Sequence, residues 1–187
     1  MLNNCSMIDP DIRTSSTAVQ YGAITMVLIG LGANTPSTIG PPIKTLMAAI
    51  GLMKKAGISC AQQSNWYESA PVPISDQAWF LNGVLQVETD KQPETLLQYL
   101  HDLERAFGRD RRMRNEPRPI DLDLLAFGSR VIQGGCNLPH PRMHERAFVL
   151  LPLREIAPNW LHPLLQKTIT ELIAELPKGQ ETRVMER

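Results

Sequence analysis

The order of helix and strand patterns is the feature that most restricts how this chain can fold. Two stretches with apolar residues at helical spacing each begin beside a proline and end at a glycine, residues 41–57 and 93–108. Proline suits the first turn of a helix and glycine suits its end. Short apolar or β-branched runs, which predict strands, lie before, between and after these helices: residues 24–30, 58–69, 79–89 and 120–127.

The predicted order is therefore β-α-β-β-α-β, which is the order of the split βαβ, ferredoxin-like fold. We expect an α/β (α+β) sandwich with an antiparallel-rich sheet and helices packed on it. Residues 131–138 predict a turn with short strands, and two further helical stretches follow at 145–158 and 168–176. Pro152 predicts that the first of these helices is broken in two, because proline disrupts a helix interior.

One domain is expected. A chain of 187 residues can bury one substantial core, and we assign that core to residues 24–187. Residues 1–23 are polar and without periodicity, so they predict a flexible N-terminal extension.

The charges are balanced overall but not along the chain. Nineteen basic and nineteen acidic residues give a net charge of zero, which argues against binding nucleic acid or a membrane surface by bulk charge. Six arginines nevertheless fall within fourteen residues: Arg105, Arg109, Arg111, Arg112, Arg114 and Arg118. Such a local positive field indicates a small anionic ligand.

The cysteines and the N-terminal residues bear on the cellular compartment in which the protein is expected. Cys5, Cys60 and Cys136 are odd in number and form no CxxC pair. No signal-peptide pattern and no apolar run of membrane-spanning length is present. We expect a cytoplasmic protein with reduced thiols that acts as a monomer.

Asp121 and Asp123 are the main candidate metal ligands. Residues two apart on a strand share one face, so the carboxylates would lie roughly 7 Å apart at about 3.3 Å per residue. Like charges at this spacing repel unless a cation lies between them, and hard carboxylate oxygens suit Mg²⁺. The alternative is a solvated strand face with two unrelated acids.

The neighbouring arginines favour the metal-and-phosphate interpretation. Arg109 follows the glycine that ends a helix, and Arg118 lies between Pro117 and Pro119, which stiffen the backbone on both sides. Guanidinium groups bind phosphate oxygens in pairs. The alternative is a flexible charged surface segment.

Three further patterns are weaker. Gly30-x-Gly32 follows a strand but lacks the rest of a dinucleotide or P-loop motif. Phe80 and Asn82 share a strand face and suit a flat heterocycle, although taken alone they are better explained as an ordinary core phenylalanine and a loop-facing asparagine. His140, flanked by prolines, suits a phosphate ligand or proton carrier better than zinc.

These residues, in this order and spacing, resemble the 6-hydroxymethyl-7,8-dihydropterin pyrophosphokinase family of folate biosynthesis. The resemblance is carried by "GLGAN", "SNWYESAPV", "FLNGVLQVET", "LERAFGRDRR", "PRPIDLDLL" and "LPHPRMHERAFVLLPLREIAP". It implies a ferredoxin-like α/β sandwich that transfers pyrophosphate from ATP to the pterin alcohol and releases AMP. The alternative from another class is a non-enzymatic, anion- or RNA-binding ferredoxin-like domain.

The resemblance also implies roles for individual residues. Asp121 and Asp123 would bind two Mg²⁺ ions and, with Arg109 and Arg118, carry the catalysis. Residues implied for ATP binding are Glu104, Arg109, Arg118, His140 and Arg146. Residues implied for the pterin are Ser69, Ala70, Pro71, Val72, Phe80, Asn82 and Phe148, with the two phenylalanines sandwiching the ring.

The arginine loop is expected to move. Its like charges repel when the site is empty, so residues 109–117 should be mobile and close over Mg-ATP. Asn115 stands where many family members have tryptophan, so less apolar area would support the closed loop.

Overall fold

The computed structural model describes residues 25–109 and 116–186. The predicted N-terminal extension, residues 1–23, lies outside the described residues. So do Asn115 and most of the loop for which closure is predicted.

The described chain contains helices and strands in the following order: β1 Val27–Ala33, α1 Pro42–Lys55, β2 Ser59–Gln63, β3 Tyr67–Ser69, β4 Phe80–Glu88, α2 Pro93–Ala106, β5 Asp121–Phe127, a 3₁₀ turn Met143–Glu145, α3 Ala147–Ile156, α4 Ile169–Ala174 and β6 Thr182–Val184. Both proline-opened helices therefore begin and end close to the predicted positions. Both also begin at an extended N-cap residue with proline in the first turn.

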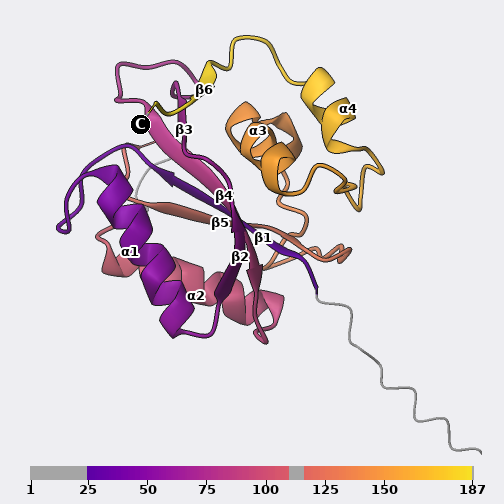
Figure 1. Cartoon of the computed structure of the whole chain (residues 1–187), viewed down its shortest axis with the longest axis horizontal. Helices are drawn as coiled ribbons and strands as arrows, with labels where there is room; N and C mark the ends of the chain where they lie inside the picture. The colour runs from indigo at the N-terminus through magenta and orange to yellow at the C-terminus, as the bar shows by residue number, and fades with distance from the viewer. Residues whose placement is uncertain (1–24, 110–115, 187) are drawn as a thin grey trace, which may run out of the picture.

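The strands form one antiparallel sheet in the order β5-β1-β4-β3-β6, with β2 paired to the other end of β4. With α1 between β1 and β2 and α2 between β4 and β5, this is the ferredoxin-like arrangement, and the predicted fold class is confirmed. Figure 1 shows α1 and α2 on one side of the sheet and α3 and α4 on the other.

The predicted strand at residues 58–69 is in fact two short strands, β2 and β3. Ser64 lies between them, and its side chain takes the place of one backbone bond to β4. The Val84 N–H donates to Ser64 Oγ at 3.0 Å, and the Ser64 hydroxyl donates to the Asn65 carbonyl at 2.7 Å. A side chain that bonds neighbouring backbone groups competes with regular pairing.

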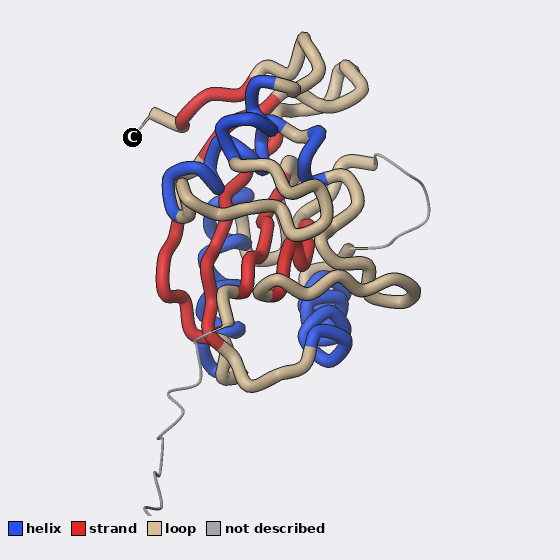
Figure 2. Tube along the Cα trace, turned by 90° about the vertical axis from the view of Figure 1, so that its right-hand side faces the viewer, coloured by secondary structure: helices blue, strands red, loops and turns tan. Residues whose placement is uncertain are grey.

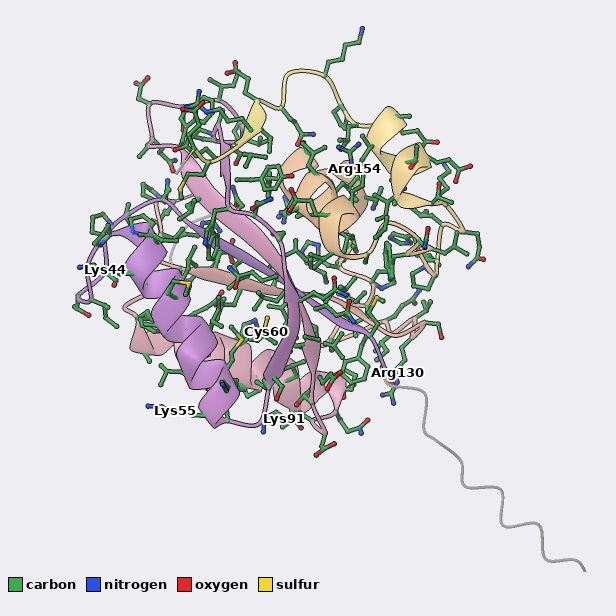
Figure 3. All side chains as sticks on the ribbon, viewed as in Figure 1. Lys44, Lys55, Cys60, Lys91, Arg130 and Arg154 are labelled. Carbon is green, nitrogen blue, oxygen red and sulfur yellow. The ribbon has the colours of Figure 1, made fainter. Side chains whose placement is uncertain are left out.

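Two apolar layers hold the sandwich together. One lies between the sheet and α1 and α2, and it contains Ile29, Leu31, Leu122 and their neighbours. α1 turns its polar side away from this layer, and Lys44 and Lys55 point outward in Figure 3. The second layer, around Leu28 and Leu125, packs against α3 and α4. Within the described residues no helix combines the length and apolar character needed to cross a membrane.

The predicted break at Pro152 is wrong, because α3 runs through it as one helix. Proline removes one N–H bond and crowds the preceding turn. Val149 and Leu150 before it, and Leu153 and Ile156 after it, are all buried against the sheet. Their shared packing keeps both halves of the helix on one axis. The interruption falls instead at Arg146, between the 3₁₀ turn and α3.

Candidate active site

The site lies on the sheet face that α3 and α4 cover only at one end. Figure 2 views this side and shows long loops beside the helices. The second apolar layer occupies the part of the face around Leu28, Val84 and Leu125. Beyond it, toward the start of β5, the face carries Asp121, Asp123 and Asn82 in place of apolar side chains. Polar and charged groups therefore collect beyond the part of this face that the second apolar layer covers.

The two glycines of β1 form the floor of this region. Gly32 is the register partner of Asp121 on one side and of Asn82 on the other, and Gly30 is the partner of Asp123. The pair thus lies within a strand and is not a phosphate-binding turn. A Cβ at Gly32 would come within 3.3 Å of Asn82 Oδ1 and 3.6 Å of Asp121 Cβ. Glycine therefore keeps open the space between the acids and the amide.

Asp121 lies between two arginines. Its Oδ1 accepts from Arg109 at 2.5 Å and its Oδ2 from Arg118 at 2.9 Å. Arg109 also pairs with Glu104, whose Oε1 accepts from the Leu122 backbone at 2.7 Å. Glu104 is only 1% exposed. It therefore acts from below the site, by holding the Arg109 guanidinium against the start of β5.

Asp123 faces a second basic group. Its Oδ2 lies 3.4 Å from the Arg146 guanidinium and 4.0 Å from His140 Nε2. Desolvation, together with repulsion from Asp121, raises the pKa of Asp123, although 31% of its side chain remains exposed. Burial, followed by the charges of nearby arginines, lowers the pKa of His140, although Asp123 opposes this shift. The net shift favours the neutral form of His140 beside this acid.

Asn34 is a site residue that the sequence reasoning missed. Its Oδ1 accepts from the Arg118 N–H at 2.7 Å, and the Arg118 carbonyl accepts from the backbone of Asn34 at 3.0 Å. Its amide nitrogen donates to Gln77 Oε1 and to the Ala78 carbonyl, each at 3.2 Å. Asn34 thus ties Arg118 to the loop after β3. The sequence feature that could have indicated Asn34 as a site residue is its position as a polar residue directly after a buried strand.

Arg118 also has unused hydrogen-bonding capacity. Its Nε is buried and has no hydrogen-bond partner among the described residues. A buried donor without a partner is unfavourable, so an acceptor in the site would be stabilised there. A phosphate or carboxylate oxygen is the kind of acceptor that suits a guanidinium group.

The aromatic and amide side chains lie beside the acids. Phe80 and Asn82 share the open face of β4, as predicted. Asn82 is 4% exposed, and its amide nitrogen donates to Ser69 Oγ at 3.0 Å. The Arg118 guanidinium carbon lies 5.4 Å from the Phe80 ring centre. The Arg146 guanidinium carbon likewise lies 5.5 Å from the Phe148 ring centre.

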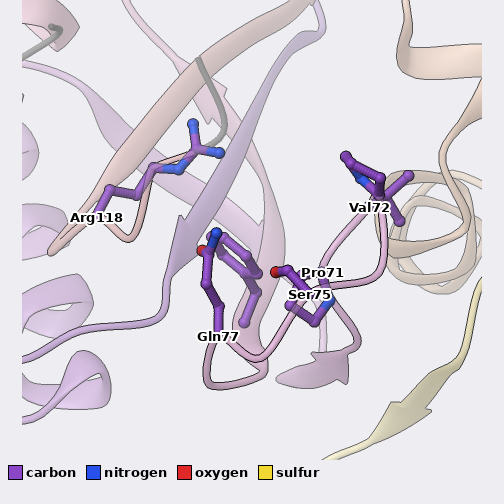
Figure 4. A pocket seen from close by; sticks show the side chains of 7 residues that line it. Pro71, Val72, Ser75, Gln77 and Arg118 are labelled. Atoms are coloured by element: carbon purple, nitrogen blue, oxygen red, sulfur yellow. The ribbon is translucent and has the colours of Figure 1, made fainter. Parts of the chain in front are cut away.

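A shallow pocket opens next to Phe80. It is lined by Pro71, Val72, Pro73, Ser75, Gln77, Phe80 and Arg118. Figure 4 shows Arg118 on the segment before β5 and Val72, Ser75 and Gln77 on the loop after β3. The Ala70 N–H donates to the Glu181 carbonyl at 3.0 Å, so it is not available to a ligand. The structure thus brings the predicted acids, arginines and aromatic residues onto one face.

Fold and site together define a class of protein: a ferredoxin-like α/β domain that carries an acidic pair, opposed arginines and an aromatic pocket on the open part of its sheet. The sequence profile of the 7,8-dihydro-6-hydroxymethylpterin-pyrophosphokinase (HPPK) family matches residues 28–158. The chain belongs to this family.

Curated relatives agree with this assignment. The 2-amino-4-hydroxy-6-hydroxymethyldihydropteridine pyrophosphokinase of Synechocystis sp. is 40% identical over 158 residues, which are 83% of this chain and 76% of that protein. The protein of the same name from Methylorubrum extorquens is 38% identical over 161 residues, 84% of this chain and 98% of that protein.

Solved structures agree on the fold. A crystal structure of a Plasmodium falciparum HPPK-DHPS triple mutant aligns with a TM-score of 0.65 at 15% identity, over 81% of this chain and 43% of that chain. At this identity the likeness concerns the fold alone.

Proposed function

We propose that this chain transfers the pyrophosphoryl group of ATP to the hydroxymethyl oxygen of 6-hydroxymethyl-7,8-dihydropterin and releases AMP, a step of folate biosynthesis. Membership of the HPPK family and the names of its relatives support this activity. The observation that carries the proposal is the open sheet face. Two carboxylates, Asp121 and Asp123, lie between opposed arginines and directly beside an aromatic and amide pocket.

The arginines are suited to the ATP phosphates. Arg109 and Arg118 both pair with Asp121, so a metal ion at the carboxylates would free both for phosphate oxygens. Arg146 and His140 border the same region from beside Asp123. Glu104 contributes through its hold on Arg109. We therefore assign ATP binding to these five residues, with Arg109 and Arg118 meeting the charge that develops during transfer.

The acidic pair fits Mg²⁺. Asp121 and Asp123 offer hard carboxylate oxygens on one strand face. No cluster of three or more His, Cys, Asp or Glu residues suited to a metal occurs in the described ranges. Water and phosphate would therefore complete the coordination, as is usual for Mg²⁺. Bound Mg²⁺ neutralises phosphate oxygens and orients the triphosphate, and we propose two ions for this site.

The pterin is assigned to the pocket beside Phe80. Phe80 and Phe148 supply flat apolar faces for the ring, and Asn82 supplies an amide for its hydrogen-bonding edge. Ser69 holds the Asn82 amide in place. Backbone groups of residues 70–72 border the remaining edge, where the Ala70 N–H is already bonded to the Glu181 carbonyl.

Positioning and charge neutralisation carry most of the proposed reaction. The pterin hydroxyl oxygen forms a bond to the β-phosphorus of ATP. The bond from that phosphorus to the α–β bridging oxygen breaks, and AMP leaves with the electron pair. The hydroxyl proton passes to solvent. Among the described residues, Asp123 is the one candidate for a general base that could take this proton first, and it is a candidate by its position alone.

The setting of the protein belongs to the same proposal. We expect a monomer in the cytoplasm, where ATP is abundant, with no nucleic-acid or membrane partner. The rival, a non-enzymatic anion- or RNA-binding domain, is not favoured, since the relatives that the chain matches over most of their length carry an enzyme's name.

The nucleotide product tests the activity. The full-length protein is incubated with Mg²⁺, ATP and the reduced pterin alcohol, and AMP, ADP and pterin are measured by chromatography. AMP is expected to appear in step with loss of the pterin, and chelation of Mg²⁺ should stop both. Formation of ADP, or no turnover, would contradict the proposal.

A further inference from the structure

Residues 180–185, here named the C-terminal strap, join the two sides of the proposed pterin site. The first side is residues 66–72, which include β3 and lead into the loop that lines the pocket beside Phe80. The second side is residues 145–148, which carry Arg146 and Phe148, the ring that the proposed function assigns to the pterin. The match to the family profile ends at residue 158, so the strap lies outside the part of the chain that the profile covers.

The strap is bonded along the first side through its backbone. β6 pairs with β3 in antiparallel register, with Thr182 opposite Ser69 and Val184 opposite Tyr67. The Glu181 carbonyl accepts from the Ala70 N–H at 3.0 Å, and the Met185 N–H donates to the Trp66 carbonyl at 2.8 Å. These bonds extend beyond β6 in both directions and hold the start of the loop that lines the pocket.

The strap reaches the second side through one side chain, that of Gln180. Its Oε1 accepts from the Ala147 N–H at 2.9 Å, and its Nε2 donates to the Glu145 carbonyl at 2.7 Å. These two backbone groups flank Arg146, which is extended and provides no side-chain cap for α3. Gln180 therefore bonds the first N–H of the helix and fixes the backbone on both sides of Arg146.

The far end of α3 is tied to β3 independently. The Tyr67 hydroxyl donates to Glu155 Oε1 at 2.5 Å, and the Asn65 N–H donates to Glu155 Oε2 at 2.8 Å. Loss of the Gln180 bonds would therefore leave α3 in place at its far end. The freedom gained would be confined to the end that carries Arg146 and Phe148.

We propose that Gln180 is a positioning residue for pterin binding, an inference that rests on the proposed function. By fixing residues 145–147 to the strap, it holds the backbone that carries the Phe148 ring. The strap bonds both sides of the site, so it orders them together before the substrate arrives. Residues that are already ordered before the substrate binds lose less conformational entropy on binding, so the affinity for the substrate is higher.

The matched variants are Gln180→Leu, Gln180→Glu and Lys178→Ala in the full-length chain. Leucine removes both bonds, whereas glutamate keeps an acceptor for the Ala147 N–H and loses the donor to Glu145. Lys178 is exposed and two residues away, and it serves as the control. KM for the pterin, KM for ATP, kcat and the melting temperature are measured for each protein.

For Gln180→Leu we expect KM for the pterin to rise about tenfold, the factor that corresponds to about 1.4 kcal/mol. Gln180→Glu should give an intermediate rise, and Lys178→Ala should match the wild type. KM for ATP should change less than KM for the pterin, because Arg146 is one of several groups on the phosphate side. A graded effect on pterin KM is not expected from a residue that only stabilises the fold.

Two results would overturn the inference, and they are distinguishable. An active wild type whose Gln180→Leu variant loses thermal stability but keeps both KM values would reduce Gln180 to a helix cap. A wild type that forms no AMP would overturn the proposed function and this inference together.

Discussion

Asn34 offers the sharpest test of how the site is held together. Its side chain is 5% exposed and makes three hydrogen bonds: one from the Arg118 N–H at 2.7 Å and one each to Gln77 and the Ala78 carbonyl at 3.2 Å. Asn34→Ala removes all three. It leaves the Arg118 N–H without its acceptor and separates the segment before β5 from the loop after β3.

The size of the effect follows from these contacts. A buried or partly buried backbone donor left without an acceptor costs about 1–3 kcal/mol. The two longer bonds run to partly exposed partners and add less, so we expect a loss of about 2 kcal/mol in the free energy of unfolding. Because Arg118 would no longer be aimed by its backbone, kcat/KM should fall by roughly 10- to 100-fold.

Urea denaturation measures the first quantity and steady-state assays the second. The matched control is Asn137→Ala, since Asn137 is exposed and accepts one bond, from the Gly134 N–H at 2.9 Å. We expect the control to lose less than about 1 kcal/mol and to keep full activity. If Asn34→Ala unfolded at the same urea concentration as the control and kept its activity, Asn34 would not be the tie between these segments.

Two further predictions concern ionisable groups. Asp121→Ala and Asp123→Ala should each lower turnover by roughly 10²-fold or more. The far-UV circular dichroism should stay unchanged, because both acids lie on the open face of the sheet. Near wild-type activity in either variant at ordinary Mg²⁺ would contradict the metal assignment. Burial, with help from His144, lowers the pKa of His162 to about 4, below the value of about 6.5 expected for the unfolded chain. Between these two pH values, His162 therefore binds a proton in the unfolded chain but not in the folded protein. The free energy of unfolding should fall as the pH drops from about 6.5 to 4, by at most about 3 kcal/mol. The melting temperature of His162→Gln should depend less on pH across this window than that of the wild type, and equal slopes would show that His162 does not titrate in this way.

The local patterns in the sequence determined most of the secondary structure. The proline and glycine signals around α1 and α2 act within one or two turns of chain, so they were readable without any tertiary contact. The two-residue spacing of Asp121 and Asp123 placed both acids on one face of β5 for the same reason. The order of these elements was enough to predict the ferredoxin-like arrangement.

Local signals do not determine the structure where distant contacts compete with them. Pro152 predicts a break, but packing on both sides of it keeps α3 whole. The strand pattern at residues 58–69 is continuous in the sequence, but hydrogen bonds of the Ser64 side chain divide it into β2 and β3. β6 was not predicted at all, because a three-residue strand has no periodicity of its own and exists through its pairing with β3.

The site itself was decided by tertiary structure. The sequence supplied candidate acids, arginines and aromatic residues, but not which of them meet. Glu104 reaches Arg109 across the end of α2. Arg146 meets Asp123 because the chain after β5 turns back beside this strand, where the His140 N–H donates to the Leu125 carbonyl. Asn34 and Arg118 are 84 positions apart, and Gln180 lies 35 positions from Glu145. Contacts at such separations depend on strand register and helix packing, which no local pattern of residues encodes.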